Sequence, residues 1–212
     1  MPFGIQNIGS TCYINSVLQC IHSTPVLKNA LSRYAGECPV TIATRDINVP
    51  SLLEHMTQFS KEPHDPHEFI LALIEHIEKT LGKELFYGVV KSKFITRDGK
   101  ATETRSEFGS LMFHNGDMDL DKPDYIIDGG FSYKQMVYEK MPKVLICLFV
   151  TPVVTELPKV YKGKMLTGCV VHFPGHYVAC VKEDDKWFII DDDRIYQTDE
   201  SFKAPIYIAV YS

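Results

Sequence analysis

The first third of the chain carries hydrophobic residues at helical spacing. Four apolar residues at positions i, i+3, i+4 and i+7 form one stripe of a predicted helix: Ile14, Val17, Leu18 and Ile21. Pro25 ends or interrupts this helix. A second helix is predicted over residues 26–34. A third begins near Asp65 and continues to Leu81, with an apolar residue every four positions and charged residues on its other face.

After residue 86 the pattern changes to short runs rich in Val, Ile, Tyr and Phe, which predict strands. These strands cover residues 89–95, 143–152, 169–173, 176–182, 187–190 and 206–211. Residues 96–128 are polar, with turn signals at Asp98-Gly99 and Asn115-Gly116. A helical half followed by an antiparallel β half predicts an α+β fold with a cleft between the two lobes.

Composition excludes several classes of protein. The 212 residues, 45% of them hydrophobic, suffice for one sizeable core but not for two ordinary domains. The formal net charge is -5 and no stretch is rich in Lys and Arg, which argues against a nucleic-acid partner. No apolar run reaches the roughly 18 residues that a membrane helix needs. No signal peptide is visible, so we expect a cytoplasmic location, with the nucleus as a further option.

The cysteines and histidines give no metal motif. The six cysteines show no C-x-x-C spacing and are expected to be reduced thiols, so we expect neither a zinc site nor another cofactor. His64 and His67 are three residues apart, but no third or fourth ligand is evident. We therefore predict no metal site.

Cys12 is the candidate nucleophile. It stands where the first helical stripe begins, after the glycine-containing turn of residues 7–10. The positive end of a helix dipole lowers the pKa of a thiol there, by about 0.3–1 kcal/mol in free energy. The alternative is a buried apolar cysteine. The other five cysteines are interpreted as structural: Cys20, Cys38, Cys147, Cys169 and Cys180.

His176 is the candidate base. It opens a strand that returns through the polar turn of residues 183–186 into a second strand ending in three aspartates, residues 191–193. If Lys182 pairs with Trp187, His176 lies opposite Asp193, and a slip of one or two residues brings another aspartate opposite instead. A carboxylate there would fix the imidazole tautomer. A half-buried strand histidine beside a solvated strand end is the alternative.

Three segments resemble motifs of the ubiquitin-specific protease family. Residues 4–16, Gly-Ile-Gln-Asn-Ile-Gly-Ser-Thr-Cys-Tyr-Ile-Asn-Ser, resemble its Cys box, and residues 175–179, followed by Trp187 and the aspartates, resemble its His box. Residues 64–69 resemble an intermediate box. Residues 133–150 and 206–211 are similar to later strands of the family. The likeness follows the family's order over most of the chain.

The resemblance implies a papain-like fold as one catalytic domain over residues 1–212. Residues 1–85 would form the helical thumb and residues 86–212 the β palm, with a fingers extension at residues 87–140 that grips ubiquitin. It also implies hydrolysis of the isopeptide bond after the C-terminal Gly-Gly of ubiquitin, with ubiquitin and ubiquitinated proteins as partners and a monomeric enzyme.

The resemblance also assigns roles to eight residues. Cys12 matches the nucleophile, His176 the base, Asp191 the orienting residue and Asn7 the side-chain donor of the oxyanion hole, while Asp192 matches a neighbour that shares or replaces the orienter in some members. The other three would contact the ubiquitin tail: Asp65, Glu68 and Tyr177. From the residues alone, the alternatives are an N-cap for Asp65, a solvated helix residue for Glu68 and a core tyrosine for Tyr177.

The chain departs from the family in three places. Residues 87–140 are short and lack the two Cys-x-x-Cys pairs that hold zinc at the fingertips, so we expect reduced fingers. Pro63 and His64 stand where the family has glutamines, and the loop of residues 172–174 is abbreviated. Such a small enzyme would suit a virus, acting inside the host cell.

Other functions remain open at the level of sequence. The reduced fingers are compatible with a protease for another ubiquitin-like modifier. A catalytically silent ubiquitin-binding module would not need Cys12, His176 and Asp191 together. A general papain-like protease would not need the match at Asp65 and Glu68.

Overall fold

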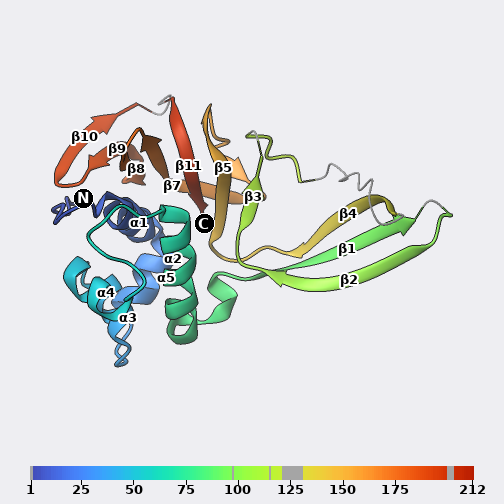
Figure 1. The fold of residues 1–212 in the computed structure, drawn as a ribbon, viewed down its shortest axis with the longest axis horizontal. Coiled ribbons are helices and arrows are strands. Elements are labelled where there is room, and N and C mark those ends of the chain that lie inside the picture. The colour runs from blue at the N-terminus through green and yellow to red at the C-terminus, as the bar shows by residue number, and fades with distance from the viewer. Residues whose placement is uncertain (1, 97, 115, 121–130, 200–202) are drawn as a thin grey trace.

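The computed structural model describes residues 2–96, 98–114, 116–120, 131–199 and 203–212. Helices come first along the chain and strands follow, as the α+β prediction required (Figure 1). Within the described residues, no helix is long and apolar enough to cross a membrane.

The three predicted helices are present, together with two that were not predicted. The predicted ones are α1 (Cys12–Ser23), α2 (Pro25–Ser32) and α5 (Pro66–Leu81). The unpredicted ones are α3 (Pro39–Arg45) and α4 (Val49–His55), followed after α5 by the 3-10 turn η1 (Lys83–Leu85). Helices α3 and α4 are seven residues long and carry a proline in their first turn, which favours a helix start but offers little periodicity.

Helix α1 is buried on every side rather than along one stripe. All its residues, the polar Asn15, Ser16 and Gln19 included, are buried. The helix packs against α2 and α5 on one side and against strands of the β lobe on the other. Its first residue, Cys12, is thereby fixed at the boundary between the lobes.

The β lobe, or palm, is a sheet in the order β10-β9-β8-β7-β11-β5-β3, with the short β6 paired to β7. Neighbouring strands are antiparallel, except that β3 pairs in parallel with β5. Their bounds are β3 (Leu111–Phe113), β5 (Leu145–Thr155), β6 (Val160–Tyr161), β7 (Lys164–Phe173), β8 (His176–Glu183), β9 (Lys186–Asp191), β10 (Arg194–Thr198) and β11 (Ala204–Tyr211). One hydrophobic cluster joins the helices to this sheet and a second covers its other face.

A β-bulge in β11 reverses which face of the palm each residue meets. Both ladders of β11 shift register between Ile206 and Ile208, so Tyr207 has no partner in either. Ile206 belongs to the cluster on the far face of the palm, which is the face turned away from the helices. Ile208 belongs to the cluster shared with the helices. An inserted residue changes the phase of the pleat in this way.

A three-stranded antiparallel sheet, the arm, projects from the palm (Figure 1). It consists of β1 (Gly88–Thr96), β2 (Ala101–Phe108) and β4 (Phe131–Lys140), in the order β2-β1-β4. The predicted turn at Asp98-Gly99 joins β1 to β2, with Gly99 at φ 81. Asn115, in the second predicted turn, lies outside the described residues.

Candidate active site

A cleft of about 480 Å³ opens between the start of α1 and the turn that joins β7 to β8. Its walls come from segments far apart in the sequence: Asn7, Gly9, Ser10, Cys12, Tyr13, Pro63, His64, Asp65, His172, Gly175, His176 and Tyr177. Five of the eight residues proposed from the sequence are among them. The other three, Glu68, Asp191 and Asp192, are not among the lining residues.

The turn before Cys12 is shaped by Asn7. Its Oδ1 accepts hydrogen bonds from the backbone N–H of Gly9 (3.3 Å), the backbone N–H of Thr11 (3.1 Å) and the Thr11 hydroxyl (3.1 Å). A Cβ on Gly9 would lie 2.8 Å from the Lys61 Cβ, so only glycine fits at this point of the turn. The loop therefore delivers Cys12 to the first position of α1.

Burial raises the pKa of the Cys12 thiol above its ordinary value. A hydrogen bond from the Tyr177 backbone lowers this pKa, and the negative charge of Asp192 raises it. The net direction is opposite to the lowering expected at a helix N-terminus. The dipole supplies only about 0.3–1 kcal/mol, and desolvation of a side chain that is 7% exposed outweighs it.

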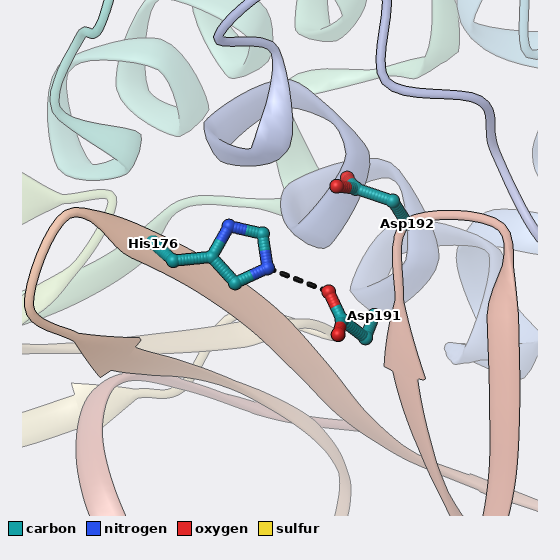
Figure 2. Close-up of side chains that lie close together, drawn as sticks. All are labelled: His176, Asp191 and Asp192. Carbon is teal, nitrogen blue, oxygen red and sulfur yellow. Dashed lines mark hydrogen bonds and ion pairs between the residues drawn. The ribbon is translucent and has the colours of Figure 1, made fainter.

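His176 and Asp191 form a hydrogen-bonded pair. His176 is the first residue of β8, Asp191 is the last residue of β9, and Nε2 lies 2.6 Å from the Asp191 Oδ1 (Figure 2). With Nε2–H donating to this carboxylate, the neutral tautomer leaves Nδ1 as an acceptor. Figure 2 shows that second ring nitrogen turned away from Asp191.

The hairpin has one of the registers considered from the sequence, and one of the three aspartates reaches His176. Lys182 pairs with Trp187 as predicted. The ladder stops at Ala179 and Ile190, because the chain turns at residues 192–193 into β10. Asp193 is therefore not aligned with His176, and Asp191 reaches the imidazole instead.

Asp192 faces the N-terminal segment. Its Oδ2 accepts from Asn7 Nδ2 at 2.8 Å, its Oδ1 from Asn15 Nδ2 at 2.7 Å, and its carbonyl oxygen from the backbone N–H of Ile5 at 2.8 Å. These bonds tie the β9–β10 turn to the loop that carries Cys12. The amide of Asn7 has two N–H groups, so one remains for another acceptor in the cleft.

Of the three residues proposed for the ubiquitin tail, Asp65 and Tyr177 line the cleft and Glu68 does not. Asp65 is half-buried and caps α5, because its Oδ1 accepts from the backbone N–H of His67 at 2.7 Å. Glu68 is exposed in the first turn of α5. The Tyr177 ring stacks on His172 with centroids 4.8 Å apart. Asp65 is thus a helix cap, as the alternative reading held, and its carboxylate also lines the cleft.

Tyr207 is a residue of this region that the sequence did not reveal. Its hydroxyl donates to Asp65 Oδ2 at 2.8 Å, and its ring lies 6.2 Å from that of Tyr177. No pattern marks the β11 bulge that aims Tyr207 toward the cleft.

The sequence offered His64 and His67 as a weak metal candidate, but they are engaged elsewhere. His64 Nε2 lies 3.1 Å from the Ser60 hydroxyl, and His67 is bound to β11. Among the described residues, one group has ligand atoms within 4.8 Å of one another: His176, Asp191 and Asp192. The hydrogen bonds above already account for this group.

A second cavity, of about 50 Å³, lies in the far face of the palm. It is lined mainly by apolar side chains, with Cys169 and Cys180 from adjacent strands, and it holds none of the proposed site residues. All six cysteines are free thiols.

A helical lobe and a β lobe that share a cleft of this kind form the α+β architecture of the papain-like hydrolases, in the version found in ubiquitin-specific proteases. The family model described as ubiquitin carboxyl-terminal hydrolase matches residues 3–211. The chain belongs to this family.

Individual relatives match over shorter stretches. Ubiquitin carboxyl-terminal hydrolase 6 of Arabidopsis thaliana is 39% identical over 59 residues, which cover 28% of this chain and 11% of that protein. The human ubiquitin carboxyl-terminal hydrolase 17-like protein 23 is 31% identical over 97 residues, which cover 36% of this chain and 51% of that protein. The chain thus spans only part of the length of these relatives.

Solved structures match over nearly the whole fold. The SAGA DUB module of Ubp8, Sgf11, Sus1 and Sgf73 bound to monoubiquitin has a chain with a TM-score of 0.86 at 18% identity. The match covers 99% of this chain and 68% of that one. A structure of the yeast SAGA DUB module with an Sgf73 variant gives a TM-score of 0.83, also at 18% identity and with the same coverage. At this identity the likeness establishes the fold.

Proposed function

We propose that the chain is a deubiquitinating thiol protease that hydrolyses the bond after the C-terminal Gly-Gly of ubiquitin. The observation that carries the proposal is that Cys12 and His176 line the same cleft, with His176 bonded to Asp191 at 2.6 Å. Membership of the hydrolase family supports the reaction, and the similar module bound to monoubiquitin supports the partner.

Burial raises the pKa of the Cys12 thiol, so attack by Cys12 requires a base to take its proton. As Sγ attacks the glycine carbonyl carbon, the thiol proton passes to Nδ1 of His176, and Asp191 stabilises the imidazolium. The imidazolium then protonates the leaving lysine amine, which departs and leaves a thioester on Cys12. Water, deprotonated by His176, attacks the thioester and releases the ubiquitin carboxylate and the free thiol.

The oxyanion of each tetrahedral intermediate needs donors in place beforehand. The free N–H of the Asn7 amide and the backbone N–H of Cys12 are the candidates. Asp192 holds the Asn7 amide at 2.8 Å and so limits its rotation. Removing one oxyanion donor typically lowers kcat by about 10²–10³-fold.

The test is reaction with ubiquitin and ubiquitin-like proteins that carry a C-terminal electrophile. We expect a covalent adduct with ubiquitin in the wild type and none in Cys12→Ala, measured by intact mass. An adduct only with another modifier would assign a different substrate, and binding without any adduct would make the chain a silent ubiquitin-binding module. His176→Ala should lose turnover while it keeps its affinity for ubiquitin, and full activity in that variant would refute the role of His176.

A further inference from the structure

His67 is connected to the cleft through Tyr207. Its Nε2 lies 2.8 Å from the backbone carbonyl oxygen of Tyr207, and its ring stacks on the Tyr207 ring with centroids 3.7 Å apart and planes 11° apart. One histidine therefore contacts both the backbone and the side chain of the same tyrosine.

That tyrosine is the bulge residue of β11. Tyr207 pairs with neither neighbouring strand, so strand pairing does not fix the position of its backbone. Bulges beside active sites commonly re-aim a side chain, and a bulged backbone needs partners from outside the sheet to hold one conformation. The imidazole of His67 supplies such a partner.

Tyr207 in turn orients Asp65. Its hydroxyl donates to Oδ2 at 2.8 Å, while the first turn of α5 holds Oδ1 at 2.7 Å. Each carboxylate oxygen keeps a further lone pair for a donor in the cleft. A guanidinium that binds a carboxylate already fixed in this way loses less side-chain freedom on binding.

We propose that His67 is a positioning residue for the basic tail of the substrate: it holds the bulged Tyr207, which fixes the Asp65 carboxylate to receive an arginine that precedes the Gly-Gly end. The proposal rests on the function proposed above. His67 does not touch the reacting atoms, so its effect falls on substrate binding and not on the chemical step.

Two substitutions separate the hydrogen bond of His67 from its bulk. His67→Gln keeps a donor near the place of Nε2, whereas His67→Leu has none. With a fluorogenic ubiquitin substrate, His67→Leu should raise KM about fivefold and leave kcat within about twofold, as expected for one lost hydrogen bond. His67→Gln should stay within about twofold of the wild type in both constants. His55→Leu, at an exposed position on α4, is the control and should change neither.

The pathway through Tyr207 has its own test. Tyr207→Phe should raise KM to a similar extent, and the double variant His67→Leu/Tyr207→Phe should be no worse than Tyr207→Phe alone. Additive effects in the double variant, equal effects of Leu and Gln, or a fall in kcat at unchanged KM would each overturn the proposal. If His67→Leu loses its cooperative thermal transition, His67→Asn replaces it, because its shorter amide does not reach the Tyr207 carbonyl.

The two proposals fail in distinguishable ways. A wild-type chain that forms no adduct with the ubiquitin electrophile refutes the proposed function. A wild-type chain that reacts, with the same KM in all His67 variants, refutes only the role of His67.

Discussion

Two adjacent aspartates perform different tasks at the site. Asp191 contacts the imidazole of His176, whereas Asp192 binds the amides of Asn7 and Asn15 on the other lobe. Asp192 has a φ of 55°, a left-handed conformation, in the turn that joins β9 to β10. One aspartate therefore serves the base and the other serves the nucleophile loop.

Substitution of each aspartate should change a different property: the reactivity of Cys12 for Asp192, and kcat for Asp191. Asp192→Asn removes a negative charge that raises the pKa of Cys12, so that pKa should fall. Alkylation of Cys12 by iodoacetamide at neutral pH should then be faster than in the wild type. Asp191→Asn should leave the wild-type alkylation rate nearly unchanged and lower kcat, by up to about 10⁴-fold as for triads with a misoriented imidazole. Alkylation is followed by intact mass.

The outcome can contradict the assignment in a simple way. If Asp192→Ala abolishes hydrolysis while Asp191→Ala retains it, Asp192 is the residue on which the base depends. Asp192→Ala should also lower the stability of the fold, because it leaves the buried amide of Asn15 with fewer hydrogen-bond partners. This loss costs about 1–3 kcal/mol. Urea denaturation of both variants distinguishes unfolding from a catalytic defect.

Helix α1 is the element on which both lobes converge. Near its C-terminal end, His22 is buried and its Nε2 lies 2.8 Å from the carbonyl oxygen of Thr44 in α3. Burial lowers the pKa of His22 below its ordinary value, an effect that the bond to Thr44 and the charge of Glu183 oppose and that Lys28 reinforces. The fold therefore favours the neutral imidazole.

Stability should fall with acidification because of this histidine. Between the folded pKa and the ordinary value of 6.5, the unfolded chain binds more protons than the folded one, so the free energy of unfolding rises with pH. The contribution is complete above pH 6.5 and declines below it, with a slope of at most about 1.4 kcal/mol per pH unit. His67, whose pKa burial also lowers, acts in the same direction.

Urea denaturation between pH 7.5 and 5.5 measures this slope. His22→Gln, which can still donate to Thr44, should be less pH-dependent than the wild type. An unchanged slope in this variant would mean that other groups carry the pH dependence.

Elements with a strong hydrophobic period or many β-branched residues could be predicted from the sequence. Exposed strands held by backbone pairing and very short helices could not. Helix α5 and strand β8 follow from their apolar spacing. Strand β2, with the sequence Ala-Thr-Glu-Thr-Arg-Ser-Glu-Phe, has almost no buried side chain and is held by backbone pairing in the arm. Helices α3 and α4 are too short for a periodic signal.

The same division applies to the site. Cys12 and His176 stand at element boundaries that the pattern marks, so both were predictable. The contact between Tyr207 and Asp65 depends on a bulge, and the high pKa of Cys12 depends on how many atoms of both lobes surround it. Neither property is local in sequence.

At the scale of the whole molecule, the arm is the feature least dependent on the core. Strand β2 is almost fully exposed, and the surface of the arm carries ion pairs such as Lys91–Glu103 at 2.6 Å and Arg105–Glu139 at 2.7 Å. Exposed pairs of this kind contribute little to stability. The arm stands where the sequence predicted reduced fingers.

Shortening the arm should separate binding of the ubiquitin body from binding of its tail. Lys91 and Arg105 are paired in the β1–β2 ladder, so residues 92–104 can be replaced by an Asn-Gly turn. This variant should raise KM for the fluorogenic ubiquitin substrate and leave hydrolysis of a fluorogenic tail peptide unchanged. Equal KM for ubiquitin in both forms would show that the arm does not contact the substrate.

The place of β11 has a consequence for synthesis of the protein. This strand follows every other strand of the palm in sequence, yet it lies between β7 and β5 in the interior of the palm and carries Tyr207. A nascent polypeptide on the ribosome therefore lacks a central strand until the residues after 203 have left the exit tunnel. We expect hydrolytic activity to arise only after that point, so that translation products truncated before β11 are inert.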